Sequence, residues 1–368
     1  MSLRIAVQMD PIETVNIATD SSFALIEAAQ KRGHAVYEYH VESLTLDADS
    51  RLYARCFPVT VQPVQGNHAT KGEAVRLDLG KDIDVVLMRQ DPPFHMGYIT
   101  GTHLLERIKG ETLVVNDPVS VRNAPEKVMV LDFREFMPPT LITRSVDEVR
   151  RFMAEHGAVV VKPIHGNGGK AIFRIPPNGE NLSALFEVFN QMWPEAHMVQ
   201  PFLPEVAEGD KRIVLIDGVV AGAINRIPGE GEFRANMAVG GSAQATTLTA
   251  REQEICDALG PVVRERGLIF VGIDVIGGKY LTEINVTSPT GIRAIDRFNG
   301  TDTPGMIWDA IEARLRGRER SLAAQGQTFA ANIDRWQADF YQLASLRYTT
   351  SRERGHRRHR QTQTCPVH

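Results

Sequence analysis

The chain has 368 residues, of which 43% are hydrophobic and 23% are charged, with 41 Lys and Arg against 45 Asp and Glu. A single core stops growing at roughly 250–300 residues, so two or three domains are expected. The composition excludes a disordered chain and a membrane protein, and the net charge of −4 excludes a global attraction to nucleic acid. Cys56, Cys256 and Cys365 are too few and too widely spaced for a disulfide framework. With no signal-peptide core and no long apolar run, a cytoplasmic location is expected.

Residues 1–122 alternate between strand and helix signals. A β-branched run at 3–9 is followed by a helix start at Asp20-Ser-Ser, and Gly33 ends that helix before a strand at 36–39. Beyond the less regular stretch 45–80, strands at 84–89 and 112–116 flank a helix through 103–107. This alternation predicts an α/β domain with a parallel, Rossmann-like sheet. Loops that follow its strands are the expected ligand sites, and they carry Asp10, Asn16, Arg89 and Asp91.

Residues 123–316 change to an α+β pattern. A capping box at Ser145-Val-Asp-Glu148 predicts a helix to Gly157, and strands are expected at 158–163 and 170–175. Further strands are expected at 198–203 and 212–216, a helix begins at Thr249, and 268–286 forms a hairpin. The glycine-rich stretch 227–241 is a candidate lid. A second domain is therefore predicted over 123–316.

The last part, 317–368, is expected to be a helical extension followed by a basic tail. Phe329, Ile333, Trp336 and Phe340 have helical spacing, and five Arg, two His and one Glu lie between Ser351 and Arg360. The tail has two interpretations, a polyanion-binding segment or an unstructured end, and terminal tails are usually unstructured.

A glycine loop at 166–171 fits the dinucleotide pattern G-x-G-x-x-A. That fingerprint must open a helix, whereas a strand is expected to follow here. Ile164 and Ala171 also exclude a P-loop. Two interpretations stay open: a flap whose backbone N–H groups cover phosphates, and a plain hairpin turn.

The predicted hairpin at 268–286 carries three oxygen-bearing side chains, Asp274, Glu283 and Asn285. A two-residue or four-residue turn puts all three on one face, whereas an odd-numbered turn breaks this geometry. Cross-strand neighbours lie about 5–8 Å apart, which suits oxygen ligands of Mg²⁺. The alternative is a polar face in contact with water.

Several basic side chains are candidates for binding anions. Lys162 ends an apolar strand, where a buried ammonium group needs an anionic partner. Lys127 suits either a phosphate contact or the surface. Arg212, Arg226 and Arg234 flank or lie within the candidate lid, where guanidinium groups can clamp carboxylate or phosphate, although each alone is more often a surface residue.

These residues together resemble the ATP-grasp superfamily of carboxylate–amine ligases, and within it the bacterial glutathione synthetase family, from about residue 3 to 315. The resemblance follows the order Lys127, Lys162, the glycines, Asp210-Lys-Arg212 and Asp274 to Asn285. It is carried most specifically by five segments: Met-Asp-Pro-Ile at 9–12, Asp-Ser-Ser-Phe at 20–23, Met-Arg-Gln-Asp-Pro-Pro-Phe at 88–94, Gly-Leu-Ile-Phe-Val-Gly-Ile-Asp at 267–274 and Leu-Thr-Glu-Ile-Asn-Val-Thr-Ser-Pro-Thr at 281–290.

The resemblance implies a pre-ATP-grasp domain at 1–122, a two-subdomain ATP-grasp fold at 123–316, and a homo-oligomer, a tetramer. It implies ATP-dependent ligation of γ-glutamylcysteine to glycine through an acyl phosphate, with Mg²⁺, or Mn²⁺ in its place, as the cofactor. The implied ATP-binding residues are Lys127, Lys162, Gly166, Asn167, Gly168, Gly169, Gln200, Pro201, Phe202, Leu203 and Asp210. Arg212 and Arg234 would be catalytic, and Asp274, Glu283 and Asn285 would bind the metal. The implied substrate-binding residues are Asn16, Asp20, Ser21, Arg89, Asp91, Arg226, Ser288 and Thr290.

Some residues depart from the family pattern. His165 lies where an acidic residue is expected, Lys170 adds a cation after the flap, and Ala235 replaces a lid glycine. Two other functions stay open: a superfamily ligase with another acid or amine substrate, and an ATP-binding protein without catalysis. The first hundred residues argue against the former, and the complete set of metal-binding and arginine residues argues against the latter.

Overall fold

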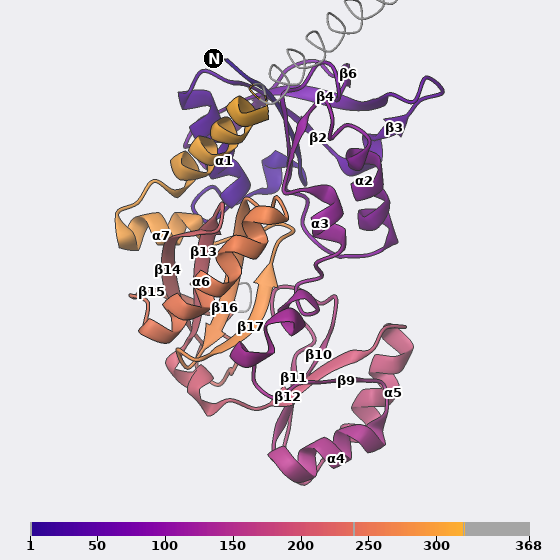
Figure 1. Ribbon diagram of the computed structural model, residues 1–368, viewed down its shortest axis with the longest axis vertical. Coiled ribbons are helices and arrows are strands. Elements are labelled where there is room, and N and C mark those ends of the chain that lie inside the picture. The colour runs from indigo at the N-terminus through magenta and orange to yellow at the C-terminus, as the bar shows by residue number, and fades with distance from the viewer. Residues whose placement is uncertain (1, 238–239, 319, 321–368) are drawn as a thin grey trace, which may run out of the picture. The chain divides into compact units, whose positions relative to one another are not determined.

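The computed structural model describes residues 2–237, 240–318 and 320, so the helix predicted through Phe329 to Phe340 and the basic tail lie outside the described residues. The chain divides into two compact units, Met1–Ile311 and Glu312–His368. The first unit contains three sheets (Figure 1). In the second unit, residues 312–318 and 320 are helical.

The N-terminal sheet has the parallel arrangement that the sequence predicts. Its parallel strands pair in the order β2 (Ala35–Tyr39), β1 (Arg4–Gln8), β7 (Val85–Met88), β8 (Leu113–Val115). Short helices follow these strands: η1 (Ile12–Thr14), η2 (Val41–Ser43), α2 (Met96–Glu106) and α3 (Pro118–Arg122). Helix α1 (Ser21–Lys31) begins as predicted, because the Asp20 carboxylate accepts a hydrogen bond from the Phe23 N–H at 2.6 Å.

The irregular stretch 45–80 contains four strands that the sequence did not predict. These are β3 (Thr45–Leu46), β4 (Leu52–Val61), β5 (Ala69–Lys71) and β6 (Val75–Asp78), and they extend the sheet by antiparallel pairing. Three of them have only two to four residues and bury few apolar side chains, so their period-2 signal is weak. Pairing with β4 stabilises them.

A four-stranded antiparallel sheet forms the first part of the second predicted domain. Its order is β11 (Phe173–Ile175), β10 (Val159–Pro163), β12 (His197–Pro201), β9 (Leu141–Thr143). Helices α4 (Val146–His156) and α5 (Leu182–Met192) supply the core of this sheet. Val159 and Val161 are in that core, so the alternating residues Val160 and Lys162 face the opposite side. The glycine loop joins strand to strand, as predicted.

A five-stranded antiparallel sheet forms the other part. Its order is β15 (Ser242–Ala245), β14 (Val219–Ile227), β13 (Asp210–Ile216), β16 (Phe270–Ile276), β17 (Tyr280–Asn285). Helix α6 (Ala250–Glu265) starts with the predicted Thr249 cap, which forms a full capping box with Glu252. The remaining short helices are η3 (Met129–Phe136), η4 (Pro204–Glu208) and α7 (Ile292–Asn299).

The hairpin β16–β17 has an odd-numbered turn, yet it keeps the metal candidates on one face. Its loop has three residues, 277–279, between the paired residues Ile276 and Tyr280. A β-bulge at Thr282 then shifts the register by one, so Asp274 pairs with Glu283 and Gly272 with Asn285. The expectation that an odd turn breaks the geometry is therefore wrong, because the bulge compensates for the extra residue.

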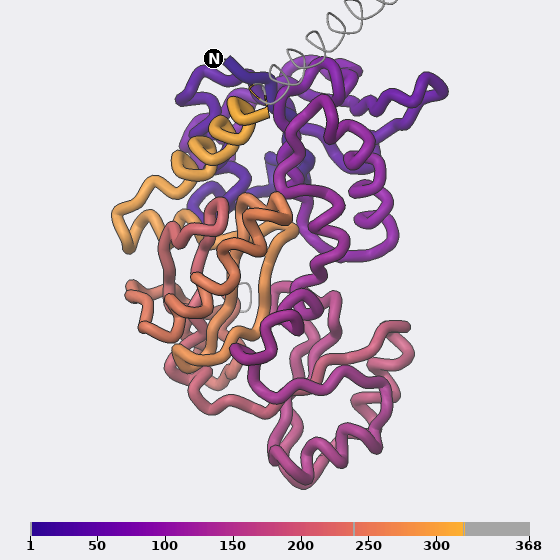
Figure 2. Tube along the Cα trace, in the orientation of Figure 1, coloured from indigo at the N-terminus to yellow at the C-terminus, as the bar shows by residue number. Residues whose placement is uncertain are grey.

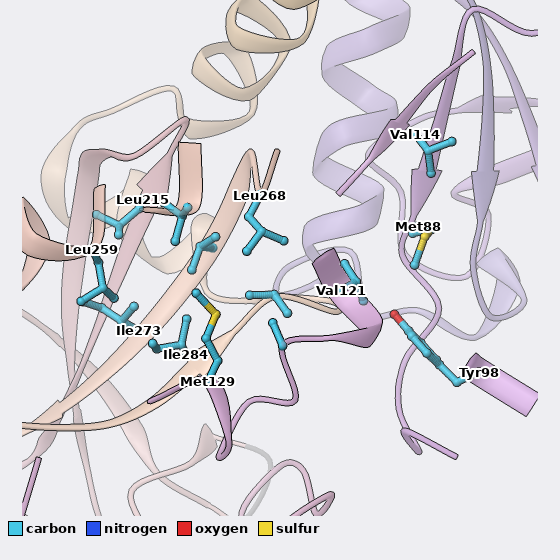
Figure 3. Close-up of a cluster of buried hydrophobic side chains, with 14 of the residues drawn as sticks. Met88, Tyr98, Val114, Val121, Met129, Leu215, Leu259, Leu268, Ile273 and Ile284 are labelled. Carbon is cyan, nitrogen blue, oxygen red and sulfur yellow. The ribbon is translucent and has the colours of Figure 1, made fainter. Parts of the chain in front are cut away.

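One hydrophobic cluster is shared by the N-terminal sheet and the five-stranded sheet (Figure 3). Met88, Val114 and Val121 lie at its N-terminal side, and Leu215, Ile273 and Ile284 lie at the other. Asn116, just after β8, joins the two sheets: its amide nitrogen donates to the Phe270 and Val286 carbonyls and its oxygen accepts from the Phe270 N–H. Figure 2 follows the chain from the N-terminal sheet into the four-stranded sheet and back to the five-stranded sheet.

Candidate active site

The first cavity lies between the four-stranded and five-stranded sheets and has a volume of about 650 Å³. Val160 and Lys162 of β10 line it from one sheet, and Asp274 and Ile276 of β16 line it from the other. Gln200, Pro201, Phe202, Leu203 and Asp210 also line this cavity, as do Arg234 and Glu283. The structure therefore brings together six of the eleven predicted ATP-binding residues, namely Lys162 and these five, with the catalytic candidate Arg234 and the metal candidates Asp274 and Glu283 beside them.

The wall of this cavity is largely apolar, and it also carries the charged side chains of Lys162, Asp210, Arg234, Asp274 and Glu283. Phe202 packs edge-to-face on Phe233 at 6.1 Å between ring centroids, and the Arg174 guanidinium lies 3.9 Å from the Phe202 centroid. Gln200 is buried, and its amide nitrogen donates to the Thr140 hydroxyl at 2.9 Å. A pocket with both apolar and charged lining suits a ligand that combines an aromatic base with charged groups.

A second cavity of about 890 Å³ contains four of the eight predicted substrate-binding residues, with one catalytic candidate and two metal candidates beside them. Asp91, Arg212, Arg226, Asn285, Ser288 and Thr290 all line it, together with Asn167 and Gly168 of the glycine loop. Glu283 and Asn236 line both this cavity and the first. The two cavities therefore meet at a carboxylate, which is the arrangement that transfer of a group from one bound molecule to another requires.

Two arginines and two carboxylates form a buried network across β13, β14 and β16. Arg212 holds Asp274 with two contacts, Nε to Oδ1 at 2.5 Å and Nη2 to Oδ2 at 3.0 Å. Arg226 Nη2 lies 2.7 Å from Asp210 Oδ2 and 3.1 Å from Asp274 Oδ1. Burial opposes ionisation of Asp274, but the two arginines outweigh it and hold its pKa well below the ordinary value. Burial raises the pKa of Asp210 to about 6 although Arg226 opposes the rise.

Lys127 and Lys162 have different surroundings. The Lys127 ammonium donates to the Gly166 carbonyl and lies 3.4 Å from Glu283 Oε1. Lys162 is 7% exposed, and in the described part of the chain its ammonium has no hydrogen-bond acceptor. Burial lowers its pKa, with the charge of Lys127 adding to the effect and the carboxylates of Glu283, Asp210 and Asp274 opposing it. A cation that faces a cavity without a partner is a ready binding group for an anion.

The metal candidates lie together, but the arginines also contact one of them. Within the described residues, no group of three or more His, Cys, Asp and Glu gathers closely enough to hold a metal, since this set has only two carboxylates. Asn285 directs its amide nitrogen to the Gly272 carbonyl and Asp274 Oδ2. Within the described residues, no hydrogen bond reaches its carbonyl oxygen, and Asn285 lines the second cavity. Glu283 and Asn285 fit a hard divalent cation, whereas Asp274 would have to share its oxygens with the guanidinium groups.

Arg234 and the glycine loop hold each other. Arg234 Nη2 pairs with Glu232 Oε2 at 2.5 Å, and its Nη1 donates to the Gly169 carbonyl at 3.0 Å. Gly169 has φ of +75°, and a Cβ there would lie 2.6 Å from Asn236 Oδ1, so glycine is required. The contact ties the candidate lid, 227–241, to the glycine loop.

The N-terminal substrate candidates divide into two groups. Arg89 is buried and donates hydrogen bonds to the Ser22 hydroxyl and the Pro289 carbonyl. The second of these bonds holds the wall of the second cavity at 288–290 against the end of β7. Asp91 lines that cavity, and burial raises its pKa although Arg89 and Ser288 oppose the rise. Asn16, Asp20 and Ser21 line neither of these two cavities. Asn16 is exposed, and Asp20 caps α1.

Two residues that line these cavities were not predicted from the sequence. Asn236 lies in a glycine-rich stretch without a regular pattern, and Glu126 was overlooked beside Lys127. Glu126 lines the second cavity and accepts a hydrogen bond from the Thr287 hydroxyl at 2.9 Å. The position of Glu126 directly before the candidate phosphate-binding Lys127 is a sequence signal for a site residue. Nothing in the local sequence indicates Asn236.

Replacing Glu126 with Gln is expected to change how stability depends on pH. Burial raises the pKa of Glu126 to about 7 from 4.5; Lys127, Thr287 and Arg212 oppose the rise, and Glu283 adds to it. The folded state therefore binds this proton more tightly than the unfolded state does. The stabilisation of the fold by the protonated Glu126 side chain is complete below pH 4.5 and is lost as the pH rises through about 7. Since the side chain is only partly covered, we expect Glu126→Gln to gain about 1 kcal/mol over wild type between pH 5 and pH 8. Urea unfolding at both pH values measures this, and an equal gain from the exposed Glu187→Gln would contradict it.

The protein has the fold of the ATP-grasp ligases. The ATP-grasp ligase PsnB in complex with a minimal precursor superposes with a TM-score of 0.57 at 18% identity, covering 85% of this chain and 99% of that chain. The D-cycloserine synthetase DcsG superposes with a TM-score of 0.60 at 18% identity over the same shares. At this identity the likeness shows the fold alone.

The chain belongs to the prokaryotic glutathione synthetase family. The family's N-terminal domain matches residues 3–122 and its ATP-grasp domain matches residues 126–300. A glutathione synthetase of Rhodopseudomonas palustris is 56% identical over 314 residues, which cover 85% of this chain and 99% of that protein. The predicted fold class, family and ATP-dependent ligase activity of glutathione biosynthesis are confirmed.

Proposed function

We propose that the chain binds ATP in the first cavity and joins γ-glutamylcysteine to glycine in the second. The observation that carries this assignment is that Glu283 and Asn236 line both cavities. The γ-phosphoryl group of a nucleotide in the first cavity would then face the acceptor carboxylate in the second. No side-chain nucleophile is needed, because phosphoryl transfer depends on positioning and on neutralising charge.

Two bonds form in succession. An oxygen of the cysteinyl carboxylate attacks the γ-phosphorus, the bond to ADP breaks, and an acyl phosphate results. The glycine amine then attacks the acyl carbon, phosphate leaves with the carbon–oxygen bond electrons, and the amine loses a proton as the amide forms. The protein's task is to hold the reactants in line and to exclude water from the acyl phosphate.

The charged side chains would divide this work. Lys162 and Lys127 would bind the phosphates, because Lys162 lines the first cavity and the Lys127 ammonium lies 3.4 Å from Glu283, which lines both cavities. Arg212 and Arg226 line the second cavity, where a guanidinium group stabilises the oxyanion of the tetrahedral intermediate. Arg234 would stabilise the phosphoryl group, and Ser288 and Thr290 would bind the glycine side.

A divalent cation, Mg²⁺ or Mn²⁺, would be held by Glu283 and Asn285, with Asp274 sharing an oxygen with the arginines. When bound, the cation would neutralise negative charge on the phosphates. The protein's own contribution is a hairpin whose bulge keeps the three oxygen-bearing side chains on one face.

ADP release by the purified protein with Mg-ATP tests this function. Release that requires both γ-glutamylcysteine and glycine, with glutathione as the product, is the expected result. Turnover only with other acids or amines would retain the ligase mechanism and contradict the substrates. ATP binding without any turnover would contradict the proposed catalysis.

Replacing Lys162 with Met is expected to separate function from folding. Removing a phosphate-binding charge should raise the KM for ATP at least about tenfold and lower kcat about a hundredfold. The fold should gain about 1 kcal/mol or more, because a buried ammonium without an acceptor disappears. Steady-state kinetics and urea unfolding measure the two effects. A variant as active as exposed Lys81→Met would exclude Lys162 from the nucleotide site.

In the part of the chain that the structure describes, no helix is long and apolar enough to cross a membrane. The cytoplasmic location, the homotetrameric state and the absence of a nucleic-acid partner stay predictions, and so do the domain limits at 122 and 316. Light scattering of the purified chain measures the oligomeric state directly.

A further inference from the structure

We propose that the γ-glutamyl end of the dipeptide binds in a third cavity, between α1 and α7, where Arg293 binds its α-carboxylate and Glu27 its α-ammonium group. The inference rests on the proposed function and names the residues that select a γ-glutamyl substrate. Neither residue belongs to the site described above.

The third cavity has a volume of about 930 Å³. The loop 17–19 and helix α1 form one wall and helix α7 forms the other. This loop lies between Asn16 and Asp20, which the sequence suggested for dipeptide binding. The structure thus places that loop on a cavity, although the side chains that line it differ from those predicted.

The second and third cavities are neighbours. Met237 and Gly291 line both of them. Gly291 directly follows Thr290, whose carbonyl accepts a hydrogen bond from Arg212 at 3.1 Å. The substrate's cysteinyl carboxyl must lie at the junction with the nucleotide, so its other end points away from that junction. From the cysteinyl carboxyl to the glutamyl α-carbon the dipeptide spans roughly 7 Å, the length of two extended residues.

The charges on the walls match a zwitterion. Arg293 Nη2 lies 3.0 Å from Glu27 Oε2, and the two side chains are 28% and 18% exposed. The Nε of Arg293 is buried without a hydrogen-bond acceptor in the described part of the chain, so a donor is unused. Burial opposes ionisation of Glu27, but hydrogen bonds and charge from Arg293 and Lys31 lower its pKa. Both groups are therefore charged at neutral pH.

The cavity has a surplus of positive charge. Arg297, one turn after Arg293, also lines it and makes no ion pair with a described residue. Helix α7 has no side-chain cap at Gly291, so among the described residues no side chain accepts from the N–H groups of its first turn. A second carboxylate is accommodated here beside Glu27. The γ-glutamyl group supplies a carboxylate and an ammonium group on one carbon, which is the complementary arrangement.

Two dipeptide analogues test the assignment against matched variants. N-Glutarylcysteine lacks the α-ammonium group, and 4-aminobutanoylcysteine lacks the α-carboxylate. We expect wild type to use each at least about tenfold less efficiently than γ-glutamylcysteine. Arg293→Met should raise the KM for γ-glutamylcysteine about tenfold and leave the KM values for ATP and glycine within about twofold of wild type. It should also abolish the discrimination against 4-aminobutanoylcysteine. Glu27→Gln should abolish discrimination against N-glutarylcysteine.

The controls separate recognition from structure. Arg150→Met removes an exposed arginine paired with Asp147 on α4 and should leave every constant unchanged. Arg293→Lys keeps the charge near Glu27 and should retain part of the discrimination if Arg293→Met unfolds. Variants that penalise all three dipeptides equally, or that raise the KM for glycine, would overturn the proposal. Failure of wild type to form glutathione would instead overturn the proposed function.

Discussion

Replacing Glu283 with Gln is expected to slow glutathione formation by about a thousandfold while the fold stays intact. The side chain lines both cavities, is 16% exposed, and is the carboxylate nearest to Lys127. Gln has nearly the same shape, so packing is kept. What is lost is one negative charge at the point where a cation and the transferring phosphoryl group would meet, and a carboxamide is a much weaker ligand for a hard cation.

The measurement is initial-rate ADP release over a range of Mg²⁺ concentrations, with glutathione quantified as product. Higher Mg²⁺ should restore part of the rate in the variant, because a weakened ligand set requires more cation. Glu254→Gln, which removes an exposed carboxylate paired with Arg251 on α6, is the matched control and should keep the full rate. A Glu283→Gln rate within tenfold of wild type, with unchanged dependence on Mg²⁺, would exclude the metal site.

Asp274→Asn is expected to lower the free energy of unfolding by about 3–5 kcal/mol. Asp274 is 2% exposed and pairs with both Arg212 and Arg226. An asparagine leaves two buried guanidinium groups to share the single carboxylate of Asp210. In addition, its amide nitrogen is a hydrogen-bond donor and would face the N–H donors of the arginines. The cost is that of an uncompensated buried charge rather than of one lost hydrogen bond.

Urea unfolding at pH 7 measures this loss. Asp147→Asn, in the exposed pair with Arg150, serves as the control and should change stability by less than about 1 kcal/mol. Because the pKa of Asp274 is depressed, its stabilisation is present at neutral pH and is lost only when the pH falls below the ordinary range of carboxyl groups. A loss below about 1 kcal/mol for Asp274→Asn would show that the arginines find other partners.

The elements and their order could be predicted from the sequence, because they depend on local patterns. Caps at Asp20, Ser145 and Thr249 begin the helices where expected, since a side-chain oxygen there satisfies a free N–H group of the first turn. The run of apolar residues that ends at Lys162 marked a buried strand. Strand–helix alternation in the first hundred residues predicted the parallel sheet. The characteristic segments, such as 88–94 and 281–290, indicated the family.

Long-range pairing could be decided only by the tertiary structure. The short strands at 45–80 are stabilised by a partner strand rather than by their own pattern. The bulge at Thr282 restores one-face geometry that the three-residue turn would otherwise break. Ion pairs also join residues that are far apart in the sequence. Asp274 pairs with Arg212 and Arg226. Glu27 pairs with Arg293, 266 positions away. Local periodicity determines which face of an element is buried, but it carries no information about which distant side chain will lie opposite, and that pairing sets the chemistry of the site.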